Sequence, residues 1–257
     1  MSINLKLTDY DGNVYNFPPD FWIRDDPFDT NKNVINSYYA AGGRNIADGF
    51  LNPRYITIGG QIRGNTSQEY ETNYRSFVKA ILKGGYLEKS EDVVSRYIEV
   101  KAPDVQMGPE EGTSNGIQYK EITVIFLAED VFWKDSTETV DLNIVTGDDT
   151  LTIDNTGSDF LALPIITVNA NQGVDVPGVK MVNKSDGGME FQYNYNRFQS
   201  GDILIIDCEK GTVKLNNTDS IENFFPGRFF RLQPGENTIE YEGNACSISF
   251  TFRKVYL

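Results

Sequence analysis

Hydrophobic and polar residues alternate along most of this chain, and a period of two predicts strands. Residues 1–17 show the pattern twice: Leu5 and Leu7 alternate with polar neighbours, and the alternation resumes after the turn dipeptide Asp11-Gly12. A hairpin is the structure that this order predicts. Three further alternating segments predict strands at residues 54–64, 95–104 and 117–133, with a polar loop at residues 108–116 between the last two.

One segment has a helical period instead. Thr66 and Glu69 form a capping box, and Gly84-Gly85 marks the end of the helix. The apolar stripe between them is expected to pack on a sheet as core, and it consists of Tyr70, Tyr74, Phe77, Val78, Ile81 and Leu82.

The pattern divides the chain into a mixed first part and an all-strand second part. Short strands with turn signals between them follow residue 135 to the end, which predicts a β-sandwich. We therefore expect two domains, 1–134 and 135–257. Within the first domain, residues 18–54 carry Pro, Asn, Asp and Gly with little periodicity. Stretches of this kind are usually functional or disordered, so we interpret this one as an extended arm for a partner, with a surface loop as the equal alternative.

The segment Gly201–Asn217, GDILIIDCEKGTVKLNN, predicts a second clear hairpin. Leu204, Ile206 and Cys208 fall on one face and Ile203 and Ile205 on the other, which predicts a central strand of a sandwich. Gly211 supplies the left-handed residue of the turn.

Both cysteines are expected to be small core residues, because Cys246 shares a strand face with Ile248, Phe250 and Phe252. No basic cluster lies close in sequence to lower the pKa of either thiol, so a reactive cysteine is the minor alternative. Asp9, Asp11 and Asn13 also resemble the opening of a calcium loop, but the sixth loop position falls on Val14 instead of glycine. A tight turn is the stronger interpretation.

Composition and charge then exclude several classes of function. The chain has 257 residues, is 39% hydrophobic and 23% charged, and carries a formal net charge of −14, which opposes nucleic-acid binding. It has no histidine, which excludes Ser-His-Asp triads, Cys-His dyads and histidine-ligated metals. We expect no catalytic, cofactor-binding or metal-binding residues, and no enzyme. No apolar run is long enough for a membrane span and no secretory signal opens the chain, so we expect cytoplasmic synthesis.

The order of motifs in the second half resembles the C-terminal module of siphophage distal tail proteins. These motifs are IDNTGSDFLALPIITV (153–168), GDILIIDCEKGTVKLN (201–216) and FFRLQPGENTIEYEG (229–243), where Pro234-Gly235 fixes a turn before a strand starting at Thr238. In the first half, the ITIGGQIRG strand, the helix after it and EITVIFLAEDVFWKD agree with the same family. Val131 departs from the proline common at that position.

The resemblance implies a mainly β fold, with an N-terminal split β-barrel flanked by one helix and a C-terminal galectin-like β-sandwich. It also implies a hexameric ring that joins the tail tube to the host-adsorption device around a DNA channel. Residues 18–54 would clasp the neighbouring subunit. The implied partners are the tail-tube protein, a tail-associated fibre or lysin protein and receptor-binding or baseplate proteins, at the virion tail tip after assembly in the host cytoplasm.

Two rivals come from other classes. A non-catalytic carbohydrate-binding module needs an exposed aromatic platform, for which Phe191, Tyr193 and Tyr195 on one strand face are the candidates. Trp22 and Trp133 lie before the sandwich. A glycosidase needs two carboxylates, and 37 acidic residues make candidate pairs too common to be informative.

Overall fold

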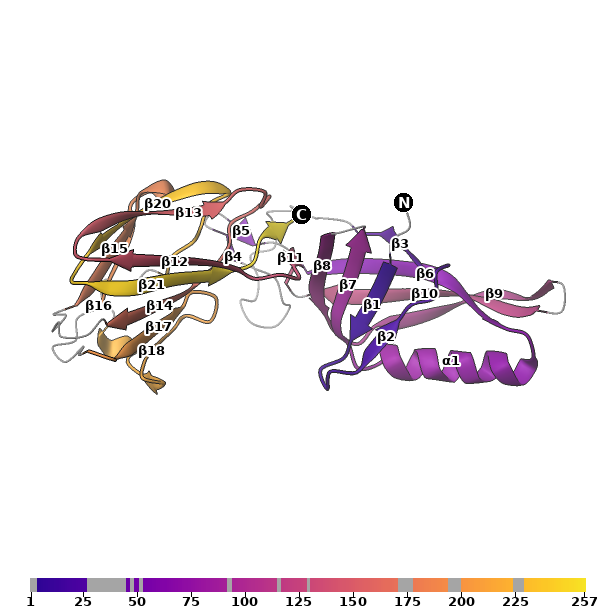
Figure 1. Cartoon of the computed structure of the whole chain (residues 1–257). Coiled ribbons are helices and arrows are strands. Elements are labelled where there is room, and N and C mark those ends of the chain that lie inside the picture. The colour runs from indigo at the N-terminus through magenta and orange to yellow at the C-terminus, as the bar shows by residue number, and fades with distance from the viewer. Residues whose placement is uncertain are drawn as a thin grey trace. The chain divides into compact units, whose positions relative to one another are not determined.

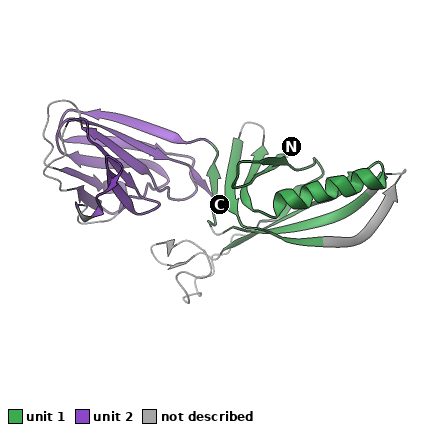
Figure 2. Cartoon of the chain, turned by 90° about the horizontal axis from the view of Figure 1, so that it is seen from below, with its two compact units in different colours: residues 1–136, 257 green, residues 137–256 purple. Residues whose placement is uncertain are grey.

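The computed structural model describes residues 4–26, 45–46, 49–50, 53–91, 94–114, 117–128, 130–170, 178–193, 200–223 and 229–257. The chain forms two compact units, Met1–Ser136 with Leu257 and Thr137–Tyr256 (Figure 2). Strands dominate both units (Figure 1), and the expected fold class, mainly β with one helix beside the sheets of the first unit, is confirmed.

Two larger sheets make up most of the first unit. In one, the order β2-β1-β7-β8-β11 joins β2 (Val14–Asn16), β1 (Asn4–Thr8), β7 (Gly85–Glu91), β8 (Val94–Val100) and β11 (Trp133–Asp135). In the other, the order β3-β6-β10-β9 joins β3 (Trp22–Asp25), β6 (Arg54–Gly64), β10 (Ile117–Ala128) and β9 (Asp104–Ser114). The short strands β4 (Asn45–Ile46) and β5 (Gly49–Phe50) pair with each other. Every pairing named here is antiparallel, as the hairpin signals predict.

Helix α1 (Ser67–Ile81) packs on the second of these sheets. Its N-cap is Thr66, whose hydroxyl accepts from the backbone N–H of Glu69 at 3.1 Å. The Glu69 carboxylate reaches back to the N–H of Asn65 at 3.0 Å, so the predicted capping box closes one residue earlier than usual. Phe77 and Ile81 are fully buried, whereas Leu82, predicted as core, is about half exposed because it follows the last helical turn.

An aromatic cluster fills the space under α1. Phe21 and Phe77 rings lie 5.3 Å apart, and Phe17 lies 5.6 Å from Phe21 and 6.1 Å from Phe77. Close approach of the helix to β6 requires Gly64, since a Cβ there would overlap the backbone of Tyr70.

Three predictions for the first unit were wrong in their bounds. Residues 108–116 were expected to be a polar loop, but β9 runs through them to Ser114, because pairing with β10 uses backbone groups and does not need apolar side chains. The strand predicted over 117–133 ends at Ala128, and the chain re-enters the other sheet at Trp133. The stretch 18–54 was expected to be an arm throughout, but Trp22 and Ile23 pair with β6, and Phe21 before them is buried.

The second unit is built from two antiparallel sheets whose inner faces supply its core. One has the order β12-β21-β14-β17-β18-β19, with β12 (Thr139–Val145), β21 (Cys246–Phe252), β14 (Ile165–Ala170), β17 (Ile203–Asp207), β18 (Thr212–Leu215) and β19 (Thr218–Asp219). The other has the order β13-β20-β15-β16, with β13 (Asp149–Asn155), β20 (Gly235–Glu242), β15 (Val179–Asn183) and β16 (Met189–Tyr193). Short elements complete the unit: η1 (Lys184–Asp186), η2 (Ile221–Asn223) and β22 (Val255–Tyr256).

The second predicted hairpin forms as β17 and β18. Gly211 adopts φ +65° in the turn between them. Leu204 and Ile206 are fully buried, but Ile203 on the opposite face is 41% exposed, so β17 is internal to its sheet without being buried on both faces. The strand after Pro234 begins at Gly235, three residues before the predicted start at Thr238.

Candidate functional site

The carboxylates of the first hairpin turn serve the turn itself. Asp9 Oδ1 accepts from the backbone N–H of Asp11 at 3.0 Å and of Asn13 at 2.8 Å. The ammonium of Lys83 lies 2.5 Å from Asp11 Oδ2 and 3.4 Å from Asp9 Oδ2. The hydrogen bond from Asn13, assisted by Lys83, holds the pKa of Asp9 below its ordinary value, although burial opposes the shift. These groups are arranged for a charged turn and not for a calcium loop.

The two cysteine thiols lie in the core, and both are free. Burial raises the pKa of Cys208 to about 12. Burial also raises the pKa of Cys246, whose Sγ–H donates to Tyr241 Oη at 3.2 Å. Neither thiol is available as a thiolate near neutral pH, so this pair offers no nucleophile.

The proposed aromatic platform is not on the surface. Phe191 and Tyr193 are fully buried; the Phe191 ring lies 4.8 Å from that of Phe230, and Tyr193 Oη shares a 2.7 Å hydrogen bond with Ser220 Oγ. Tyr195 lies outside the described residues. Core packing accounts for the two described rings, as their alternation on β16 requires.

Other searches of the described part of the chain gave two negative findings. Within those ranges, no three His, Cys, Asp or Glu side chains come close enough together to hold a metal ion. No helix within them is both long and apolar enough to cross a membrane.

A buried ion pair joins the two ends of the segment 27–53. Arg54 Nε lies 2.5 Å from Asp26 Oδ1, and the Arg54 side chain is 5% exposed. The same guanidinium donates to the carbonyl oxygens of Val131 at 3.0 Å and of Asp26 at 3.2 Å. Trp133 Nε1 donates to Asp26 Oδ2 at 2.9 Å. We call Asp26, Arg54 and Trp133 the segment base.

Lys89 completes the electrostatics of the segment base. Its ammonium lies 4.1 Å from the centre of the Trp133 ring and 3.9 Å from Asp26 Oδ2. Burial lowers the pKa of Lys89, and the attraction of Asp26 offsets part of that shift. The contacts between Asp26 and Arg54 join the residue before the segment to the residue after it, so the arrangement suits holding these two chain ends together.

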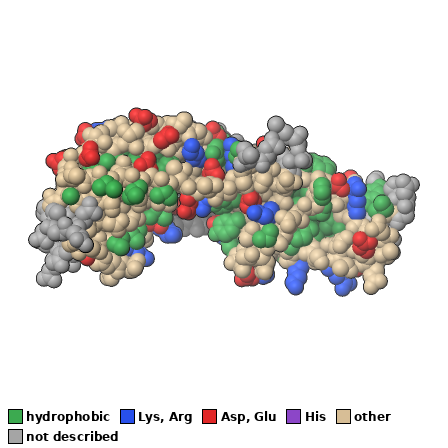
Figure 3. All heavy atoms as spheres, in the orientation of Figure 1, with side chains coloured by type: hydrophobic (Ala, Val, Ile, Leu, Met, Phe, Trp, Pro, Cys, Tyr) green, Lys and Arg blue, Asp and Glu red, His purple; other side chains and the backbone are tan. Residues whose placement is uncertain are grey.

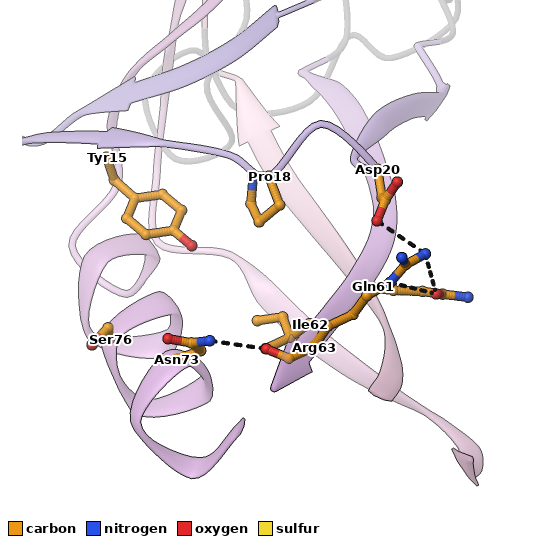
Figure 4. Close-up of a pocket in the computed structure, with 8 residues that line it drawn as sticks. All are labelled: Tyr15, Pro18, Asp20, Gln61, Ile62, Arg63, Asn73 and Ser76. Atoms are coloured by element: carbon orange, nitrogen blue, oxygen red, sulfur yellow. Dashed lines mark hydrogen bonds and ion pairs between the residues drawn. The ribbon is translucent and has the colours of Figure 1, made fainter. Parts of the chain in front are cut away.

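A groove of about 380 Å³ lies between helix α1, strand β6 and the connection that follows β2 (Figure 4). Arg63 crosses it, 3.0 Å from Asp20 Oδ2 and bonded through Nε and a terminal nitrogen to Gln61 Oε1. Asn73 of α1 donates to the Arg63 carbonyl at 2.9 Å, and Tyr15 forms another wall of the groove. Burial raises the pKa of Tyr15, so its hydroxyl stays protonated and can donate at neutral pH. The groove is lined by two hydroxyls, of Tyr15 and Ser76, by two amides and by the guanidinium of Arg63 paired with the Asp20 carboxylate, and these groups suit binding of a polar chain segment.

Residues 157–256 match the family model described as "Siphovirus-type tail component, C-terminal domain". Among solved structures, the crystal structure of SPP1 Dit (gp 19.1), described as a paradigm of the hub adsorption apparatus in phages that infect Gram-positive hosts, matches with TM-score 0.65 and 16% identity over 100% of both chains. A chain of the phage P2 baseplate in its activated conformation with Ca matches with TM-score 0.44 and 14% identity over 99% of this chain and 98% of that one. No curated protein matches the sequence.

The family match places residues 157–256 in the class of siphovirus-type tail-component domains. Within that class, the expected resemblance to siphophage distal tail proteins is confirmed: the family match covers most of the second unit, and the fold of SPP1 Dit is shared along the whole chain.

The segment base was not predicted from the sequence. Asp26 and Arg54 are separated by 28 positions, and neither belongs to a recognisable motif. One feature of the sequence could have indicated it. Arg54 is a long cationic residue at the first position of strand β6, directly after a segment of largely polar sequence.

Proposed function

We propose that this protein is the hub of a long non-contractile phage tail tip. Six copies form a ring that joins the tail tube to the host-adsorption device and leaves a channel for DNA. The observation that supports this proposal most is the likeness to SPP1 Dit over the full length of both chains, since it includes both units and not only the tail-component domain.

The proposal assigns different roles to the two domains. Residues 1–134 build the ring as a split β-barrel, and residues 135–257 form a galectin-like sandwich that faces the adsorption proteins. The segment between Asp26 and Arg54 reaches the neighbouring copy, and the segment base fixes where it leaves and returns. Closed cyclic symmetry follows if each copy contacts the next through the same two surfaces.

The acidic charge suits a channel that DNA passes without binding. Each copy carries −14, and six copies multiply that charge. Carboxylates facing a lumen would repel the phosphate backbone. The same charge opposes assembly at low ionic strength, and salt at physiological strength screens it over about 8 Å.

The proposed role is structural, not enzymatic. The chain has no histidine, and its buried thiols have raised pKa values. The proposed partners are the tail-tube protein, a tail-associated fibre or lysin protein and receptor-binding or baseplate proteins. The protein would be located at the virion tail tip after assembly in the host cytoplasm.

Size exclusion with light scattering, followed by negative-stain imaging, tests the proposal. We expect a hexameric ring, or a monomer that shifts towards a hexamer as salt or protein concentration rises. Strict monomers under all conditions, including mixtures with tail-tube and baseplate proteins, would contradict it. Binding on a glycan array in that case would support a carbohydrate-binding module instead.

A further inference from the structure

Strand β12 carries its apolar residues on the outside. Val140, Leu142 and Ile144 are 62%, 62% and 74% exposed, whereas Asp141 and Asn143 between them are half-buried. This is the reverse of the alternation expected for a strand that covers a core. In Figure 3, hydrophobic side chains gather over β12 on the face turned to the viewer.

The rows beside these residues carry uncharged side chains on the two neighbouring strands, β21 and β14. In the register of the sheet, Val140, Leu142 and Ile144 lie opposite Thr251, Ser249 and Ser247 of β21. The following row, on β14, consists of Ile165, Thr167 and Asn169. Three neighbouring strands of a chain with a net charge of −14 thus present a neutral face, which removes the main obstacle to contact between two copies.

Strand β12 is also the first strand in its sheet order, and β21 is its neighbour there. Among the strands that the structure describes, none pairs with its other edge, which presents backbone N–H and C=O groups that can pair with a further strand. Proteins usually protect such edges with lysine, proline, a bulge, an inward-pointing charge or a very short strand. β12 has seven residues, contains neither lysine nor proline, and keeps an uninterrupted register with β21. Its one charged residue, Asp141, is half-buried and accepts a hydrogen bond from Asn143 at 3.0 Å.

We propose that a second copy of this chain pairs its own β12 with this edge, antiparallel, about a twofold axis at Leu142. Val140 then lies opposite Ile144 of the other copy, and Leu142 lies opposite its own counterpart. Asp141 lies opposite Asn143 of the other copy. Within one copy the Asn143 amide already donates to Asp141 Oδ1, and its second N–H is the one that can donate to the carboxylate of the other copy. The interface is isologous, so it joins two free monomers or copies of two different rings, and not neighbours within one ring, which meet through two different surfaces.

Charge selects this register among its neighbours. Residues directly opposite each other in an antiparallel pair share a face, so the register can slip only in steps that keep the apolar residues together. One such slip places Asp141 opposite Asp141, which like-charge repulsion disfavours. A slip in either direction also leaves two residues of each β12 unpaired. The register centred on Leu142 pairs all seven residues of β12 and avoids the repulsion.

Disulfide trapping in the full chain tests the register. Cysteines at directly opposite positions can form a disulfide, because their Cα atoms lie about 4.5–5.5 Å apart. Leu142→Cys should form dimers under mild oxidation, whereas Val140→Cys alone should not. A mixture of the Val140→Cys and Ile144→Cys proteins should form the mixed dimer. Cys208 and Cys246 are buried and should give no background.

Equal trapping of Leu142→Cys and Val140→Cys would overturn the proposal. No trapping of either would also overturn it, and that is the result expected if the edge binds a strand of a different protein. A denaturing gel reports this whether or not rings form, so failure of the pairing and failure of the hub proposal are distinguishable.

Molar mass provides an independent measurement. Leu142→Lys should lower the mass at least twofold at concentrations where the wild type pairs, because a charge at the axis meets its own copy. Thr152→Lys is the matched control, since Thr152 is also exposed but lies on β13 of the other sheet. An unchanged mass for Leu142→Lys, or equal losses for the two variants, would contradict pairing through β12.

Discussion

The carboxylate of Asp26 and the guanidinium of Arg54 lie 2.5 Å apart and hold together the two ends of the segment 27–53. Trp133 binds the same carboxylate, and the Val131 carbonyl binds the same guanidinium. Asp26, Arg54 and the short stretch that holds Val131 and Trp133 are far apart in sequence and meet at one point of the first unit. These contacts hold the residues on either side of segment 27–53 next to each other.

Removing one partner of this pair should destabilise the protein strongly. Arg54→Met leaves the Asp26 carboxylate and the Val131 carbonyl without their guanidinium, which costs about 3–5 kcal/mol for a buried pair. Urea unfolding monitored by circular dichroism measures the loss. Arg75→Met is the control, because the Arg75–Glu71 pair is exposed and should contribute less than about 1 kcal/mol. Similar losses for the two variants would show that burial at Arg54 is unimportant.

Gly64→Ala should loosen helix α1 from its sheet. A Cβ at this position meets the Tyr70 backbone, which cannot rotate away as a side chain can. We expect a loss of about 1–3 kcal/mol, measured by thermal or urea unfolding. Gly147→Ala is the matched control, because a Cβ there meets nothing within 4 Å and the change should stay within about 0.5 kcal/mol. A stable Gly64→Ala protein would mean that α1 does not pack so closely.

Replacing each core cysteine with serine should destabilise the second unit. Each change places a hydroxyl in the core and should cost up to about 1–3 kcal/mol. Both new hydroxyls have one polar neighbour, the Phe230 backbone at position 208 and Tyr241 Oη at position 246, so we expect the two losses to be similar. Thermal unfolding measures both variants. Native-state labelling with a thiol reagent should be slow, and rapid labelling of either cysteine at neutral pH would contradict the buried, high-pKa assignment.

Acid should weaken the first hairpin through Asp9. The pKa of Asp9 is lowered in the folded state by the hydrogen bond from Asn13, so its contribution is complete above the ordinary value of 3.8. That contribution is lost as the pH falls through the lowered folded value. Melting temperatures from pH 7 to pH 2 should therefore fall less steeply for Asp9→Asn than for the wild type. Parallel profiles would show that Asp9 has the same pKa folded and unfolded.

Replacing residues 30–44 with a short Gly/Ser linker should prevent ring formation without unfolding either unit. The segment base and strand β6 lie outside the replaced region. The far-UV spectrum should match the wild type, while light scattering should show monomers. A Gly/Ser linker of the original length is the control for loop length. It should also prevent ring formation if the native side chains make the contact with the neighbouring copy. Rings from the shortened protein would reduce this segment to a surface loop.

Local patterns predicted much of the fold because they report on contacts close in sequence. Asp11-Gly12 and the turn at Gly211 fix two hairpins, and the alternation of Cys246, Ile248, Phe250 and Phe252 fixes the buried face of β21. The predicted ends of strands were wrong where contacts between residues far apart in sequence determine how far a strand extends. β9 extends through a polar stretch because β10 lies beside it, and Trp22 and Ile23 become a strand because β6 is available to pair.

The sequence by itself determined the strand-rich class, the single amphipathic helix with its Thr66 cap, and the core placement of both cysteines. Periodicity and capping depend on residues close together in sequence, and net charge depends only on composition, so all three can be obtained from the sequence alone. Tertiary structure alone decided that Asp26 meets Arg54 and that Val140, Leu142 and Ile144 face outward. An apolar alternation on a strand is the same whether its face meets a core or the solvent. The two sheets of the second unit pack through their inner faces, and this packing leaves Val140, Leu142 and Ile144 on the exposed outer face of β12. Only the tertiary structure therefore shows which face of the strand meets the core.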